Sequence, residues 1–151
     1  MLFGAQAPVA GAGGPDASLI AAAEACNPAG ISEALAQGAS VAFMDLKQNA
    51  TALHIAAKHG DSQAIGLLLG ARADPNALNN VHATPLVYAA QKGHVEAAKA
   101  LLAAGARPDI QTRKGKTALA IAHEKGFQHV AALLAAAAGG GQAAGAATPF
   151  A

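Results

Sequence analysis

Hydrophobic and polar positions along the chain follow a register that repeats every 33 residues. Each copy opens on a threonine and runs through a short stretch rich in alanine and aliphatic residues to a glycine. Apolar residues at helical spacing then follow. The opening threonines are Thr51, Thr84 and Thr117, and the closing glycines are Gly60, Gly93 and Gly126. A repeat of this length predicts a solenoid, in which each unit buries its apolar side against its neighbours.

Each unit is predicted to contain two short helices. The threonine hydroxyl can cap the first helix, and the glycine ends it, where a left-handed residue is needed. The second helix has apolar residues at helical spacing, namely Ile65, Leu68 and Leu69 in unit two and Ala98, Leu101 and Leu102 in unit three. A turn at Gly105–Ala106 then leads the chain out into a loop. The expected unit is therefore a helix pair followed by a loop.

Four such units are predicted between two ends rich in glycine and alanine. The units span about 17–44, 45–78, 79–111 and 112–138. The first lacks the capping threonine motif, so we expect it to be an atypical unit that closes the N-terminal end. Residues 1–16 are predicted to be a disordered lead-in and residues 139–151 a flexible tail, because the first segment is rich in Gly, Ala and Pro and the second begins with three glycines.

The repeat also resembles a known family. Unit three carries the motif residues Thr84–Pro85–Leu86, Ala89–Ala90, Gly93–His94, Leu101–Leu102 and Gly105–Ala106. Together they resemble the ankyrin repeat, with three recognisable copies and the atypical first unit covering about residues 17–138. The resemblance implies an all-α repeat solenoid of stacked helix-turn-helix repeats with short β-hairpin loops. It further implies a protein-interaction module whose hairpin tips and inner helices contact the partner.

Several positions depart from the family pattern without threatening the expected fold. Ala52 and Ala118 replace the proline that begins the first helix, and Val87 and Ala120 replace the motif histidine. Arg72 occupies a turn position where the family has glycine, which either costs strain or makes the helix end earlier, at Gly70.

The resemblance also assigns partner-facing positions. The partner-binding residues that it implies are Lys47, Gln48, Lys58, His59, Asn80, Val81, Tyr88, Gln91, Lys92, Arg113, Lys114, Lys116 and Lys125. Seven of the ten basic residues belong to this surface, whereas its only acids are Glu24, Asp45 and Glu124. A chain of net charge +1 thus gathers positive charge on one side, which predicts an acidic segment of a partner protein as the ligand. Ordinary solubility is the competing explanation for exposed lysines.

Four residues invite a functional and a structural interpretation. His54 and His94 stand where the family uses histidine to bond neighbouring backbone, so both are expected to be structural. Tyr88 is either a contact residue at the centre of the groove or a packing residue between units two and three. Asn76 is a candidate for asparagine hydroxylation by family resemblance, but we favour a role in bracing its turn. The hairpin residues Asn49, His82 and Gly115 are expected to take left-handed conformations.

The remaining chemistry argues against catalysis. The sequence has no nucleophile motif, no phosphate-binding glycine loop and no paired carboxylates on one face, and His123 and His129 lack the spacing of metal ligands. We therefore predict no enzyme, no cofactor, no metal and no small-molecule substrate. Two alternatives to partner binding remain, self-association through the alanine-rich C-terminal unit and, less favoured, nucleic-acid binding by the basic face.

The cellular setting is predicted from cysteine usage and from the termini. A single cysteine, Cys26, cannot form an intrachain disulfide and favours a reducing compartment. The first residues lack the basic region of a signal peptide, and no uninterrupted apolar run is long enough to span a bilayer. The expected localisation is the cytoplasm or the nucleus, with no membrane association.

Overall fold

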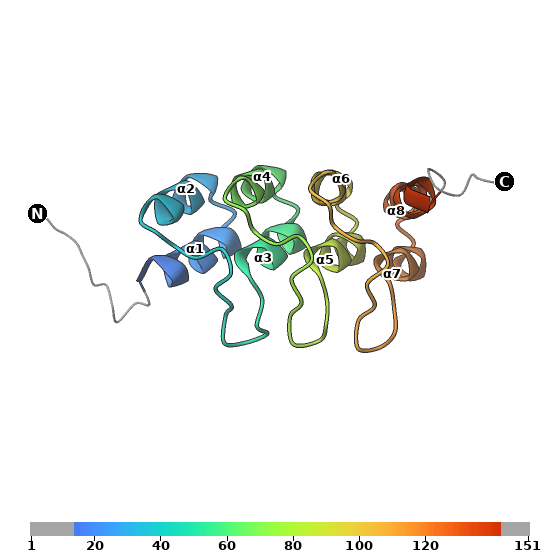
Figure 1. Ribbon diagram of the computed structural model, residues 1–151, viewed down its shortest axis with the longest axis horizontal. Helices are drawn as coiled ribbons and strands as arrows, with labels where there is room; N and C mark the ends of the chain where they lie inside the picture. Colours follow the sequence, from blue (N-terminus) through green and yellow to red (C-terminus); the bar gives the residue numbers. More distant parts are fainter. Residues whose placement is uncertain (1–13, 143–151) are drawn as a thin grey trace, which may run out of the picture.

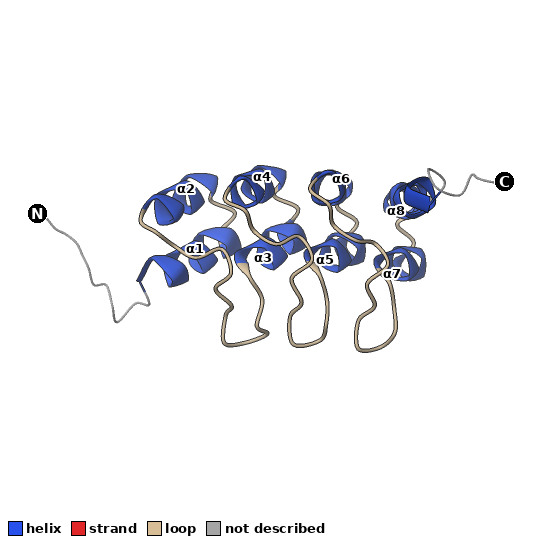
Figure 2. Ribbon diagram, viewed as in Figure 1, coloured by secondary structure: helices blue, strands red, loops and turns tan. Residues whose placement is uncertain are grey.

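Eight helices arranged in two rows make up the part of the chain that the computed structural model describes, residues 14–142 (Figure 1). One row contains α1, α3, α5 and α7, and the second contains α2, α4, α6 and α8. Three long loops extend beyond the first row (Figure 2). The helices are α1 (Gly14–Glu24), α2 (Pro28–Ala36), α3 (Ala52–His59), α4 (Ser62–Gly70), α5 (Pro85–Lys92), α6 (Val95–Ala103), α7 (Ala118–Lys125) and α8 (Gln128–Gln142). The predicted all-α repeat solenoid is confirmed.

The first helix of each later unit begins and ends as the sequence predicts. The hydroxyl oxygens of Thr51, Thr84 and Thr117 accept the backbone N–H three residues ahead, at 3.4, 3.3 and 3.2 Å. The glycines Gly60, Gly93 and Gly126 end the helices with φ of 74°, 75° and 80°. These caps satisfy backbone groups that a helix of eight residues would otherwise leave free at both ends.

The core is a thin layer in which each unit contributes a few buried aliphatic residues surrounded by alanines. Leu68, Leu101 and Leu134 are each fully buried at the same position of α4, α6 and α8. In the other row, Ala57 and Ala90 are fully buried at the contacts between neighbouring helices. Alanine contributes little apolar area but allows helix axes to approach closely, so the stacking of many units replaces a bulky core.

The three loops have the shape of hairpins without regular strands. Each is closed by a backbone hydrogen bond, from the N–H of Asp45 to Ala50 O, of Asn79 to Ala83 O and of Thr112 to Lys116 O, and a second backbone bond to the same first residue forms the turn inside it. No strand occurs within residues 14–142, because these bonds join residues too near in sequence to form a ladder. We call the loops finger one (45–50), finger two (79–83) and finger three (112–116).

The ends of the helical region differ from those expected. Helix α1 begins at Gly14, inside the predicted lead-in, and α8 continues to Gln142, inside the predicted tail. Three of the four residues by which α8 exceeds the prediction are glycines, so the helix continues past the alanine run against their low helix propensity. The rest of the predicted lead-in (1–13) and tail (143–151) lies outside the described residues.

Arg72 takes the left-handed conformation, with φ of 71°, after α4 has already ended at Gly70. The strained conformation of Arg72 and the early end of the helix, which the sequence offered as alternatives, therefore occur together. Cys26, Asn49 and His82 also have positive φ, and Gly115 completes the set of left-handed residues in the fingers. Over residues 14–142, no helix combines the length and apolarity that crossing a membrane requires.

Candidate functional site

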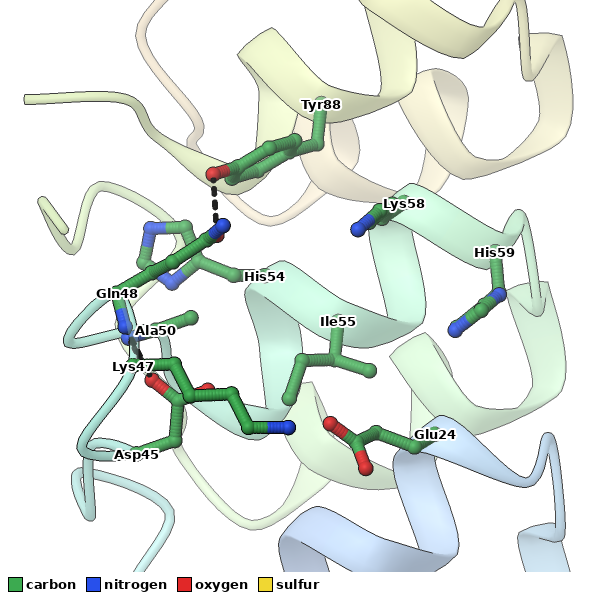
Figure 3. A pocket seen from close by; sticks show the side chains of 10 residues that line it. All are labelled: Glu24, Asp45, Lys47, Gln48, Ala50, His54, Ile55, Lys58, His59 and Tyr88. Carbon is green, nitrogen blue, oxygen red and sulfur yellow. Dashed lines mark hydrogen bonds between the residues drawn. The ribbon is translucent and has the colours of Figure 1, made fainter. Parts of the chain in front are cut away.

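The fingers and the exposed sides of α1, α3, α5 and α7 form one continuous surface, which we call the inner surface. It is hollowed into two grooves. The first groove lies beside finger one and α3, and the second lies between fingers two and three above α5 and α7. The first groove is lined by Glu24, Asp45, Lys47, Gln48, Ala50, His54, Ile55, Lys58, His59 and Tyr88 (Figure 3).

The second groove is the larger of the two, with a volume of about 520 Å³ against about 170 Å³. Its lining residues are Val81, Ala83, Val87, Tyr88, Gln91, Thr112, Arg113, Lys114, Lys116, Ile121, Glu124 and Lys125. Of the thirteen predicted contact residues, eleven therefore line one groove or both. Asn80 and Lys92 are exposed but line neither.

One polar side chain in each finger holds the backbone in its bent conformation. Asp45 Oδ1 accepts the N–H groups of Gln48 and Ala50, both at 3.0 Å. In finger two, Asn79 Oδ1 does the same for Val81 and Ala83, at 3.1 and 2.9 Å. In finger three, the Thr112 hydroxyl accepts from Lys114 and Lys116 at 3.3 and 3.4 Å. The fingers are thus shaped before any partner arrives.

The carboxyl of Asp45, the acceptor in finger one, is held in its charged form. Partial burial alone would raise its pKa, but hydrogen bonds from the N–H groups of Gln48 and Ala50, together with the positive charge of Lys47, outweigh burial and lower it. The carboxylate form is therefore the one that the finger stabilises.

Neighbouring fingers are also joined to one another. The N–H of Asn80 donates to Gln48 O, and the N–H of Arg113 donates to Val81 O, both at 3.0 Å. These bonds show that Gln48, Val81 and Lys114 are equivalent positions at the tips of successive fingers.

Finger one is one residue longer than fingers two and three. Asp45 closes on Ala50 five residues ahead, whereas Asn79 and Thr112 close on residues four ahead. The extra residue in finger one is Leu46, whose exposed fraction is 99%. The predicted units already differ in length, 45–78 against 79–111, but the contact positions were aligned on the threonines at a fixed interval of 33 residues. Alignment on the acceptors Asp45, Asn79 and Thr112 identifies the extra residue.

Tyr88 connects both grooves. Its hydroxyl accepts a hydrogen bond from Asn79 Nδ2 at 2.7 Å and donates to Gln48 Oε1 at 3.2 Å, the bond drawn in Figure 3. Its ring meets that of His54 edge to face, with centroids 5.9 Å apart. Burial raises the pKa of the phenol more than the Asn79 hydrogen bond lowers it, so the hydroxyl stays protonated. Tyr88 therefore packs between units two and three and still lines the inner surface.

The two predicted structural histidines join successive units. His54 Nε2 lies 2.8 Å from Ala83 O, and His94 Nε2 lies 3.1 Å from Lys58 O. Val87 and Ala120 stand at the equivalent positions and cannot make this bond, so within residues 14–142 the His54 link occurs only between units two and three. Both backbone-bonding predictions are confirmed.

Asn76 uses both ends of its amide to brace the next unit. Its Nδ2 donates to Gly105 O at 3.3 Å, and its Oδ1 accepts the N–H of Arg107 at 2.7 Å. The side chain therefore braces the turn of unit three. This corrects the sequence-based expectation that it braces its own turn, where the Asp74 carboxylate accepts the N–H of Asn76 at 2.9 Å.

Charge is distributed unevenly between the grooves. In the first, Glu24 and Asp45 balance Lys47 and Lys58, and the side chain of Lys47 points toward Glu24 (Figure 3). In the second, one acid faces four cations, namely Glu124 against Arg113, Lys114, Lys116 and Lys125. Lys116 Nζ donates to Glu124 Oε2, and the hydrogen bond and charge of this lysine lower the pKa of Glu124. The excess positive charge therefore belongs to the second groove.

The described residues contain little that suggests metal chemistry. Among residues 14–142, no three His, Cys, Asp or Glu side chains are grouped so as to hold a metal ion. Cys26 is exposed, on the turn after α1.

Comparison with known families gives one match. A family model described as "Ankyrin repeats (3 copies)" matches residues 19–112 and 53–143, which together include all but the ends of the chain. A comparison with curated proteins found no match.

Proposed function

Because the chain belongs to the ankyrin-repeat family, whose members generally bind other proteins, we propose that it binds an acidic segment of a partner protein on its inner surface. The observation that carries this proposal is the second groove, where four cations surround a single acid. Ankyrin repeats are typically non-catalytic. We propose the same for this chain, as an adaptor, scaffold or inhibitor that needs no cofactor, metal or small-molecule substrate.

The physical argument combines steering with preorganisation. A concave surface of one sign of charge attracts an oppositely charged segment and speeds its association. Each exposed ion pair contributes only about 0.2–1 kcal/mol, so several must form together. The fingers are already held by Asp45, Asn79 and Thr112, so binding does not have to order them.

The test is affinity capture from a lysate of the source organism with a charge-reversed variant. Lys47, Arg113, Lys114 and Lys116 are each changed to glutamate. A control variant reverses Arg72, Lys99 and Arg107, which lie outside both grooves. We expect acidic partners to be lost only from the first variant, with both variants keeping the melting temperature of the wild type. Equal capture by all three proteins contradicts the proposal.

The proposed site of action is the cytoplasm or the nucleus. The observation behind it is the single cysteine, Cys26, which suits a reducing compartment. Fractionation of source cells with an antibody against the chain tests this placement, and recovery in a secreted fraction contradicts it.

The C-terminal end of the stack favours a second candidate function, self-association. Within residues 14–142, units two and three are covered on both sides, but no element packs beyond α7 and α8 of unit four. Its Phe127 is 36% exposed, and α8 exposes Ala132, Ala135 and Ala136. Sedimentation equilibrium from micromolar to millimolar concentration tests it, and a monomer throughout that range contradicts it.

A further inference from the structure

The second groove combines apolar residues with a basic rim. Its floor is formed by Val87 and Ile121 on α5 and α7 and by Ala83 of finger two, which are buried, whereas Val81 at the tip of finger two is 48% exposed. On the rim, Arg113 and Lys114 lie at the tip of finger three and are exposed. The first groove is smaller and charge-balanced, so the two grooves select different chemistry.

We propose that the second groove takes an extended acidic segment of a partner protein with one bulky apolar side chain among its carboxylates, and that Glu124 competes with that segment for Lys116. This inference rests on the proposed function, because it specifies which part of the inner surface reads the segment and what the segment contains.

The apolar side chain is required because charge alone gives a weak and unselective complex. Exposed ion pairs are screened by salt, whereas an aliphatic or aromatic side chain packed against Val81, which is 48% exposed, removes apolar surface from water on both partners. The volume of about 520 Å³ accommodates such a side chain together with part of its backbone. Cations and apolar residues line the same groove, which suits a peptide segment that carries both kinds of side chain.

Glu124 is the internal competitor. Its carboxylate forms an ion pair with the ammonium of Lys116, and both side chains are about half exposed. A carboxylate of the partner must therefore displace the Glu124 carboxylate before it can pair with Lys116. The remaining cations Arg113, Lys114 and Lys125 form no ion pair among the described residues, which leaves them available. Glu124 therefore raises the density of negative charge that a segment needs in order to bind.

The experiment measures the binding of a dye-labelled synthetic peptide to the full chain by fluorescence anisotropy. The probe has a central leucine flanked by glutamates, and two matched peptides replace either the leucine by serine or the glutamates by glutamines. We expect the probe to bind about tenfold or more tightly than either matched peptide. We also expect Val81→Thr, which keeps the shape of the side chain, to weaken the probe severalfold without weakening the serine peptide.

The decisive variant is Glu124→Gln. It should tighten the probe about two- to fivefold, because Lys116 is released. The matched control is Glu96→Gln, which makes the same charge change at an acid that pairs with Lys99 on α6, away from the groove. Melting temperatures of all variants confirm that each is folded.

Several outcomes overturn the inference, and they differ from a failure of the proposed function. Equal binding of the leucine and serine peptides removes the apolar requirement, although lysate capture can still support an acidic partner. Equal effects of Glu124→Gln and Glu96→Gln refute competition by Glu124. No binding by any peptide refutes the site, and tighter binding of a single-stranded RNA of matched charge reassigns the groove to nucleic acid.

Discussion

His54 has a defined tautomer because of the groups that surround it. The backbone N–H of Thr51 lies 3.1 Å from His54 Nδ1 and can only donate, so Nδ1 is an acceptor and carries no proton. The proton of the neutral ring is therefore on Nε2, from which it is donated to Ala83 O. One ring thus completes the cap of α3 and fixes finger two of the next unit.

A second proton on His54 would face the Thr51 N–H, so acid should destabilise the fold. Burial lowers the pKa of His54, outweighing the Ala83 carbonyl and nearby acids, which raise it. His54 in the unfolded chain therefore becomes protonated near pH 6.5, whereas in the folded chain it becomes protonated only at a lower pH. The stability that comes from keeping His54 neutral is fully present above pH 6.5 and is lost as the pH falls below it. Urea unfolding at pH 7.5 and 5.5 should show lower stability at pH 5.5.

His54→Gln supplies the matching variant. It should cost about 1–2 kcal/mol at pH 7.5, because the cap of α3 is lost, and it should flatten the pH dependence between 7.5 and 5.5. The control His59→Gln changes an exposed histidine and should keep the wild-type pH dependence. An unchanged slope in His54→Gln would assign the acid sensitivity to other groups.

Gly93 faces two separate constraints that a substitution can distinguish. Its φ is 75°, and a Cβ there would lie 2.6 Å from Cδ1 of Phe127 in the next unit. Gly126 has the same place in unit four, with φ of 80°, but no atom within 4 Å of its Cβ position. Gly126→Ala should therefore cost about 1–2 kcal/mol for conformation alone. Gly93→Ala should cost about 2–4 kcal/mol in urea unfolding, since Phe127 must move. Equal costs would show that Phe127 adjusts freely.

Among the elements, the three fingers are built alike except for the extra residue in finger one. Leu46 is exposed, and the acceptor Asp45, the closing bond to Ala50 and the link from Asn80 to Gln48 involve other residues. Deleting Leu46 should give finger one the length of the other two and change the free energy of unfolding by less than about 0.5 kcal/mol. Deleting Val81 from finger two, by contrast, removes the acceptor of the Arg113 N–H and should destabilise clearly. A loss of several kcal/mol on deleting Leu46 would mean that the added length is structural.

The same elements show what sequence can and cannot predict here. Helix caps follow from local chemistry, so Thr51 and Gly60 could be placed from sequence alone. The link from Asn76 to the turn of unit three, or of Tyr88 to Gln48, depends on how units stack, which local patterns do not encode. Summed charge predicted a basic inner surface, but only the side-chain positions separate a balanced first groove from a basic second groove. Pairing of Lys116 with Glu124 likewise needed coordinates.

For the whole molecule, stability should be distributed by nearest neighbours, because each unit touches only the units beside it. Leu101 and Leu134 occupy equivalent, fully buried positions, but α6 packs against both α4 and α8, whereas α8 packs against α6 and α7 at the end of the stack. Truncation of either leucine to alanine should cost about 2–5 kcal/mol locally.

The helices that lose protection should nevertheless differ between the two variants, and hydrogen exchange measured by mass spectrometry can resolve this helix by helix. Leu134→Ala should raise exchange in α7 and α8 and leave α2 and α4 protected, because unit four can unfold alone. Leu101→Ala should raise exchange in α4, α6 and α8 together, since the central unit joins the two ends. Uniform loss of protection in both variants would instead mean that the four units unfold as one cooperative body. The second groove would then be only as stable as the entire stack, whereas independent fraying of unit four would open that groove and leave the first one formed.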